Sequence, residues 1–88
     1  MPSHLPAELH LRRLTVNEAL YRLEAYLDAA FMAGHPIVRL IHGKGTGALR
    51  TAIWERLGTH PLVRSYRLAL IGEGEAGVTV VDLEENGT

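Results

Sequence analysis

The sequence predicts one α/β domain: an α+β two-layer sandwich of two helices on a four-stranded mixed sheet. Strand-like and helix-like apolar patterns follow one another in the order β-α-β-α-β-β. The chain has 88 residues, 47% of them hydrophobic, which is enough for one core. The last two strand-like segments are joined by a short glycine-rich turn, which favours an antiparallel hairpin.

The first strand and the first helix are marked by alternation and by capping signals. Apolar and polar residues alternate over residues 7–13, which indicates a strand. Thr15 and Glu18 have the spacing of a capping box at a helix start. Apolar residues then recur at helical steps: Val16, Leu20, Leu23, Leu27, Ala30 and Phe31. Gly34, followed by Pro36, ends this helix.

The second half of the chain repeats a strand and a helix and then adds two strands. Residues 36–42 form an apolar, β-branched run typical of a central strand. A shorter helical stripe ends at Gly58 and contains Leu49, Ala52, Ile53 and Leu57. Residues 61–70 and 78–83 read as strands on either side of a flexible turn at 72–77. Right-handed crossovers make the first three strands parallel and the fourth antiparallel.

Composition excludes several classes of protein. The chain has no cysteine, so disulfides and thiolate metal sites are excluded. No apolar run reaches the roughly 18 residues of a membrane span, and a signal-peptide pattern is missing. We expect a soluble cytoplasmic domain at residues 7–83, between flexible ends at 1–6 and 84–88, with no membrane partner. The sequence leaves open whether the chain is a fragment and whether it dimerises.

Charged residues are unevenly distributed, although the net charge is only −1. Residues 1–38 hold three arginines against four acids, whereas residues 39–67 hold six basic residues against Glu55 alone. Residues 68–88 hold five acids and no base. A basic middle segment suits a polyanionic partner, and ordinary solvated surface is the alternative.

The stretch RLIHGKGTGALR, residues 39–50, contains a loop of alternating glycines at the carboxyl end of the second strand. Ligands of α/β sheets collect at this edge. A nucleotide-binding P-loop needs its lysine after the last glycine, but Lys44 stands between the first two, which excludes that motif. Gly43, Gly45 and Ala48 match a dinucleotide fingerprint, but the acid expected about 20 positions on is missing.

Two interpretations of this glycine loop, residues 42–47, remain open. The glycines either allow a tight turn with a solvated Lys44, or they let backbone N–H groups approach a nucleic-acid phosphate. In the second interpretation Thr46 binds the phosphate, and Lys44 and Arg50 neutralise it. His42 then stands at the strand end as a proton carrier.

Three segments together resemble the Smr (small MutS-related) domain: ELHLRRLTVNEAL at 8–20, IHGKGTGALR at 41–50 and GVTVVDL at 77–83. The chain is similar in particular to the version at the C-terminus of the bacterial MutS paralogue that suppresses recombination. The resemblance covers about residues 7–83. It implies a sandwich similar to the C-terminal domain of bacterial translation initiation factor three.

The resemblance also implies a function. It implies DNA binding and a nicking endonuclease activity on phosphodiester bonds, with branched recombination intermediates among the targets; some relatives act on RNA. It further implies fusion to a MutS-type ATPase in a bacterial, nucleoid-associated protein. The alternative is a non-catalytic DNA- or RNA-binding module.

A second family signature resembles L-D-x-R-G and here reads Leu9-His10-Leu11-Arg12-Arg13. Arg12 matches this form, whereas His10 replaces the aspartate and Arg13 replaces the glycine. An aspartate can hold a divalent metal or orient a base, and a histidine does either only in part. Magnesium or manganese therefore stays open as a cofactor, and no metal ligand is assigned.

The resemblance and the strand order together imply a site at the C-terminal edge of the first two strands. The candidate catalytic residues are His42, Lys44, Arg12 and His10. The candidate nucleic-acid-binding residues are Gly43, Gly45, Thr46, Gly47, Arg50 and Arg13. Lys44 and Arg12 are expected to stabilise a phosphorane-like transition state, and His10 to form a ribonuclease-like pair with His42.

Simpler interpretations exist for several of these residues. His42 alternatively hydrogen-bonds the loop and holds its shape, and His10 alternatively is a tolerated surface substitution. Trp54 and Tyr66 have the chemistry to stack on bases, although packing at the core or edge is favoured for both.

Overall fold

The computed structural model describes residues 5–70, 72 and 75–86 of the chain. Its elements are β1 (Glu8–His10), α1 (Val16–Met32), β2 (Ile37–Ile41), α2 (Ala48–Leu57), β3 (Val63–Leu68), a 3-10 turn (Glu75–Gly77) and β4 (Val78–Leu83). The predicted β-α-β-α-β-β order is confirmed. No helix in the described part of the chain is long and apolar enough to cross a membrane.

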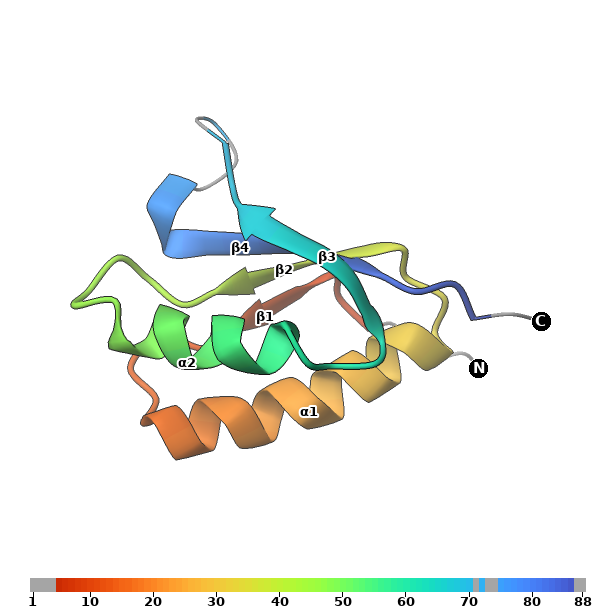
Figure 1. The fold of residues 1–88 in the computed structure, drawn as a ribbon, viewed down its shortest axis with the longest axis horizontal. Helices are drawn as coiled ribbons and strands as arrows, with labels where there is room; N and C mark the ends of the chain where they lie inside the picture. The colour runs from red at the N-terminus through yellow and green to blue at the C-terminus, as the bar shows by residue number, and fades with distance from the viewer. Residues whose placement is uncertain (1–4, 71, 73–74, 87–88) are drawn as a thin grey trace.

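The four strands form one mixed sheet in the order β1-β2-β4-β3, and both helices cover the same face (Figure 1). β1 and β2 are parallel, and β4 runs antiparallel to both of its neighbours, β2 and β3. The predicted two-layer sandwich, with three parallel strands and a fourth antiparallel, is therefore confirmed. β4 lies inside the sheet, which explains why almost all of its residues are buried.

The core lies between the helices and the face of the sheet that they cover. Its most deeply buried side chains are Leu11, Leu23, Leu27, Val38, Leu40, Ile53, Leu57 and Val81. Side chains alternate between the two faces of a strand, so their neighbours in the strands point to the uncovered face. Ile41, Ala69, Val78 and Val80 form a small second apolar cluster of this kind.

The predicted helix ends are confirmed at α1. Thr15 Oγ1 accepts a hydrogen bond from the backbone N–H of Glu18 at 3.1 Å, and Glu18 Oε1 accepts one from the N–H of Thr15 at 2.9 Å. Gly34 follows the last turn with a φ of +82°. This left-handed conformation suits glycine at a helix C-terminus.

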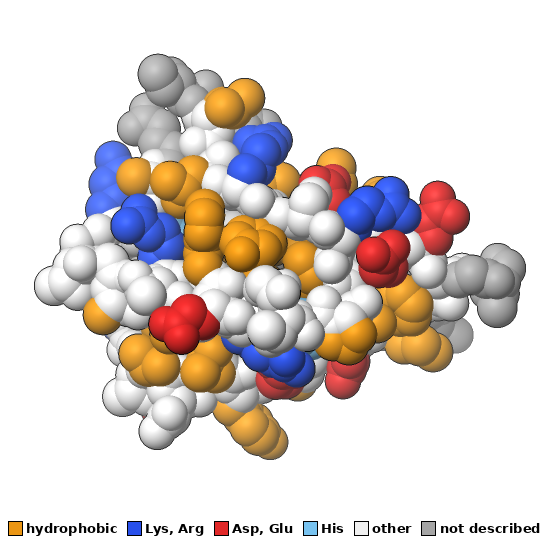
Figure 2. All heavy atoms as spheres, viewed as in Figure 1, with side chains coloured by type: hydrophobic (Ala, Val, Ile, Leu, Met, Phe, Trp, Pro, Cys, Tyr) orange, Lys and Arg blue, Asp and Glu red, His pale blue; other side chains and the backbone are white. Residues whose placement is uncertain are grey.

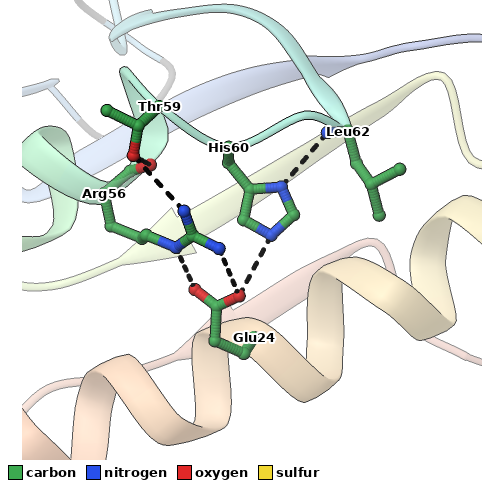
Figure 3. A network of polar contacts seen from close by, with 5 residues as sticks. All are labelled: Glu24, Arg56, Thr59, His60 and Leu62. Carbon is green, nitrogen blue, oxygen red and sulfur yellow. Dashed lines mark hydrogen bonds and ion pairs between the residues drawn. The ribbon is translucent and has the colours of Figure 1, made fainter.

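A polar network ties α1 to the end of α2 (Figure 3). The carboxylate of Glu24 accepts hydrogen bonds from Arg56 at 2.6 and 3.0 Å, and lies 3.2 Å from Nε2 of His60. His60 Nδ1 accepts the backbone N–H of Leu62 at 3.1 Å, so Nε2 carries the proton that points to Glu24. This network links the side of α1 to the C-terminal end of α2.

Several predicted boundaries differ from the structure. The first strand ends at His10 and not at residue 13, because Arg13 adopts a φ of +67° that turns the chain. The third strand covers only Val63–Leu68 of the predicted 61–70, and a register shift interrupts its pairing between Val63 and Ser65. The predicted turn at 72–77 lies partly outside the described residues.

The predicted flexible ends also lie partly outside the described residues. In the described part, the backbone carbonyl of Pro6 accepts a hydrogen bond from Tyr26 at 2.7 Å. Glu84 N–H donates to the carbonyl of Leu62 at 2.8 Å. The flexibility of the two ends therefore stays a prediction, for residues 1–6 and 84–88 alike.

Candidate nucleic-acid interface

The glycine loop lies at one end of the molecule, together with the N-termini of both helices (Figure 1). α2 begins at Gly47 without a side-chain cap, and its first turn holds no acidic residue. Uncapped N–H groups at a helix start attract anions. A hollow of about 400 Å³ opens here, lined by the glycine loop, by the start of α1 and by Arg50.

The structure requires glycine at two of the three glycine positions of the loop. Gly43 and Gly47 have φ values of +82° and +90°, which side chains rarely adopt. A Cβ at Gly43 would also lie 3.2 Å from Cγ and Cδ of Arg12. At Gly45, φ is outside the left-handed range and a Cβ would meet no atom within 4 Å. The fold therefore accounts for glycine at 43 and 47, but not at 45.

His42 is buried and forms hydrogen bonds with both ring nitrogens. Its Nδ1 lies 2.9 Å from the carbonyl oxygen of Gly43, which only accepts, so Nδ1 carries the proton. Its Nε2 lies 2.8 Å from Oγ1 of Thr79, which also receives the indole N–H of Trp54 at 2.8 Å. The hydroxyl proton of Thr79 is therefore donated to His42. These bonds form a chain from Trp54 through Thr79 and His42 to Gly43.

This environment keeps the His42 ring neutral. Burial lowers the pKa of His42 below its ordinary value, the Gly43 bond opposes that shift, and the charge of Arg50 adds to it. With both nitrogens bonded, the ring holds the glycine loop in its shape. The geometry thus supports the simpler interpretation of His42 over a proton carrier with a free nitrogen.

His10 and His42 lie on opposite faces of the sheet, so the expected histidine pair does not form. His10 pairs in register with Ile41 and points to the uncovered face, where its side chain is 66% exposed. His42 bonds Thr79, whose register partner in β2 is a core residue beneath the helices. Alternation along parallel strands separates the two imidazoles, although the strand ends are neighbours.

The residues around His10 do not offer a metal site. Its Nε2 lies 4.0 Å from Glu8 Oε1, and the Glu8 carboxylate accepts a 2.6 Å hydrogen bond from Arg39. In the residues that the structure describes, no group of three histidine or acidic side chains is arranged to hold a metal. This donor set does not fit magnesium, which prefers several oxygen ligands. The side chains around His10 therefore give no support for a magnesium-dependent step.

Cationic side chains gather at the glycine loop. The aliphatic part of Arg12 crosses Gly43, and Nη2 of Arg50 would lie 3.6 Å from a Cβ at Gly47. Across the described ranges, no ion pair involves Arg12, Arg13 or Arg50. Other cations of the basic segment are engaged elsewhere, in the pairs Arg39–Glu8, Arg56–Glu24 and Arg64–Glu84. Two cations of that segment, Lys44 and Arg50, thus lie at the loop, and Arg12 joins them from outside the segment.

The remaining predicted residues also lie at this end. Thr46 is exposed, and its Oγ1 accepts the N–H of Ala48 at 3.3 Å, which starts the turn into α2. Lys44 is exposed, with its Cγ 3.5 Å from where a Cβ of Gly77 would stand. The carbonyl of Gly77 anchors the loop by accepting the N–H groups of His42 and Gly43 at 3.1 and 2.9 Å.

Sequence reasoning missed Thr79 and Gly77. Thr79 is fully buried in the run VTVV, and a polar residue at a core position is the signal that marks it. Gly77 has no comparable signal, because its role depends on its backbone carbonyl. The sequence indicates only stacking or packing for Trp54, whereas in the structure its ring N–H starts the hydrogen-bond chain.

Fold and loop together define a class of protein: a two-layer sandwich domain with a glycine loop between its second strand and an uncapped second helix. A sequence model of the Smr domain matches residues 9–84. The chain belongs to the Smr domain family.

Its relatives agree with this assignment. Endonuclease MutS2 of Thermomicrobium roseum is 61% identical over 77 residues, which cover 88% of this chain and 10% of that protein. The crystal structure of the Smr domain of Thermus thermophilus MutS2 is 51% identical, with a TM-score of 0.86 over 88% of this chain and 96% of that one. YdaL, a stand-alone small MutS-related protein from Escherichia coli, is 28% identical, with a TM-score of 0.85 over 90% of this chain and 65% of that one. The chain thus spans about a tenth of the length of the MutS2 relatives.

Proposed function

We propose that the domain binds DNA through the glycine loop and nicks its phosphodiester backbone, as the endonuclease part of a MutS2-type protein. The observation that carries the proposal is the combination of Gly45 with the uncapped start of α2. A glycine that packing does not require, beside a helix start whose N-cap residue has no side chain to bond its N–H groups, suits close approach of a phosphate. Relatives named Endonuclease MutS2 support the reaction class.

The proposed roles follow from where the charges lie. A phosphate in the hollow contacts the N–H groups of Gly45, Thr46 and Gly47, and Arg50 neutralises it. Lys44 and Arg12 stabilise the negative charge that builds up on the phosphate oxygens as water attacks phosphorus, the P–O bond to the leaving oxygen breaks, and that oxygen gains the proton that the water gives up. His42 positions the loop, and its Nε2 takes a proton only when the Thr79 hydroxyl turns away.

Two further features are part of this proposal. Branched recombination intermediates are the proposed DNA targets, with RNA as the other polyanion that the same phosphate site accepts. The full-length protein is proposed to carry a MutS-type ATPase, as in the MutS2 relatives, and to act in the bacterial cytoplasm at the nucleoid.

A second candidate function is a nucleic-acid-binding module without catalysis. It is favoured by one observation: both nitrogens of His42 are bonded, and His10 lies on the opposite face of the sheet. The proposed site then lacks a histidine ready to move a proton. Binding through the glycine loop is common to both candidates.

Nicking of supercoiled plasmid by the purified domain separates the two candidates. The reaction is run with EDTA, with magnesium and with manganese, for the wild type and for Lys44→Ala, Arg12→Ala and His42→Ala. Arg64→Ala is the matched control, because it removes an exposed arginine at the other end of the sheet. We expect nicking by the wild type and the control, and a loss of at least tenfold in Lys44→Ala and Arg12→Ala.

Binding is measured in parallel by anisotropy of a labelled duplex at several salt concentrations. Lys44→Ala should lower the salt slope by about 1 if the lysine contacts a phosphate. Nicking that survives in all three variants would contradict the proposed site. No nicking under any condition, with salt-sensitive binding intact, would leave the binding module as the function.

A further inference from the structure

A second hollow of about 510 Å³ lies between α2 and β3, outside the glycine loop. It is lined by Arg50, Thr51, Trp54, Glu55, Tyr66 and Leu68. Figure 2 shows hydrophobic side chains gathered between these two elements, with Lys and Arg side chains beside them. The hollow is thus apolar at its centre and cationic on one side.

Two aromatic rings form the wall of this hollow. Trp54 and Tyr66 pack edge to face, with ring centroids 4.9 Å apart and planes at 80°. Both side chains are half-buried, so part of each ring is accessible. The indole is held in place by its 2.8 Å hydrogen bond to Thr79. A fixed, partly exposed aromatic surface is pre-organised for stacking.

Arg50 connects this hollow to the glycine loop, because it lines both hollows. It lies in the first turn of α2, one helical turn or about 6 Å before Trp54. A group that sits on Trp54 is therefore next to the loop's cations. Glu55 lies in the last turn of α2, away from the loop, and its charge disfavours a second phosphate at that end.

We propose that this hollow is a subsite for an unpaired nucleobase whose own phosphate lies in the glycine loop. The inference rests on the proposed nucleic-acid function and names its substrate class: a single-stranded or flipped-out nucleotide. Every base has a π-face, so stacking on Trp54 and Tyr66 accepts any sequence. The positive charge of Arg50 orients the nucleotide, because it attracts the phosphate and leaves the neutral base over the rings.

Trp54 is the chain's only tryptophan, so its fluorescence reports directly on the subsite. The domain is titrated with a single-stranded oligothymidine and with an abasic strand of equal length and charge. We expect quenching with the oligothymidine only, and about tenfold weaker binding of the abasic strand. A fully paired duplex should also leave the fluorescence unquenched.

Two Tyr66 variants test the aromatic wall. Tyr66→Leu should weaken oligothymidine binding at least fivefold and leave abasic binding unchanged, because it removes only the stacking surface. Tyr66→Phe keeps the ring and should bind like the wild type. Thermal unfolding of each variant shows whether the fold is intact.

The outcomes separate the subsite from the phosphate site. Equal binding of both strands, without quenching, would overturn the subsite and leave the phosphate site standing. No binding of either strand, measured by anisotropy, would overturn both proposals. Quenching by the abasic strand as strong as by oligothymidine would also overturn the subsite, because that strand has no base to stack.

Discussion

The hydroxyl of Thr79 donates a hydrogen bond to Nε2 of His42 across 2.8 Å and thereby joins strand β4 to the start of the glycine loop. Both residues are buried, so water does not readily replace either partner. The Gly43 carbonyl fixes the tautomer of the imidazole, and the Thr79 bond holds the ring in the orientation that makes this contact. The shape of the loop therefore depends on a residue 37 positions away in the chain.

Thr79→Val removes this bond while keeping the shape of the side chain. Nε2 of His42 and the indole N–H of Trp54 both lose their partner inside the protein, so we expect a loss of about 2–3 kcal/mol of unfolding free energy. Urea denaturation measures it, and Thr51→Val is the control on an exposed face of α2. A loss below about 0.5 kcal/mol, with the His42 ¹⁵N shifts unchanged, would contradict the hydrogen-bond chain.

Folding stability should decrease at acidic pH because of His42. The unfolded ring binds a proton near its ordinary pKa of 6.5, whereas burial lowers the pKa of the folded ring. The contribution of the neutral ring is complete above pH 6.5 and is lost as pH falls from there through the lower pKa of the folded ring. We expect a slope of at most about 1.4 kcal/mol per pH unit below 6.5.

Urea denaturation between pH 7.5 and 5.5 checks this slope. His42→Gln should be less stable at neutral pH, and its stability should depend less steeply on pH in this window than that of the wild type. His10→Gln, which changes an exposed ring, should keep it. An NMR titration that gives His42 a pKa at or above 6.5 would refute the assignment.

Gly45→Ala and Gly47→Ala should differ in folding stability. A methyl group at 45 meets open space, so folding stability should be unchanged or slightly higher, while DNA affinity falls because the phosphate loses its close approach. At 47, a φ of +90° makes alanine strained, and we expect a loss of about 1–2 kcal/mol. Thermal unfolding and anisotropy on both variants test the pair. Unchanged affinity in Gly45→Ala would remove the main support for the phosphate site.

Arg13→Gly should stabilise the fold. Arg13 has a φ of +67°, at the position where the family signature has glycine. Glycine adopts this conformation without strain but loses more backbone entropy on folding. We expect the relief of strain to be the larger effect, with a net gain of up to about 1 kcal/mol in unfolding free energy. Arg13→Ala loses the same charge but keeps the strain, so it is the matched control. Both variants should bind DNA more weakly, and only glycine should raise the melting temperature.

Glu24→Gln should loosen the contact between the two helices. The substitution removes the charge that Arg56 and His60 share, and we expect a small loss of unfolding free energy, because the Arg56 and Glu24 side chains are more than a third exposed. Chemical denaturation measures it against Glu55→Gln, which changes an exposed acid of α2. Equal stability of the two variants would show that the network of Figure 3 contributes nothing measurable.

Local signals in the sequence were sufficient for the elements and for the position of the loop. The capping box at Thr15 and Glu18, the glycines at 34 and 58, and the apolar periods act within a few residues of chain. Because these signals are local, they could not place every strand boundary correctly. The register shift next to Val63, for example, depends on how β3 pairs with β4.

The family and the glycine loop were thus determined by the sequence alone, since both are properties of contiguous residues. The tertiary structure decided which of those residues meet. Strand alternation sent His10 and His42 to opposite faces, and insertion of β4 beside β2 brought Thr79 under the loop. These are long-range contacts, set by how strands pair and which face the helices cover, and no local pattern at either residue encodes them.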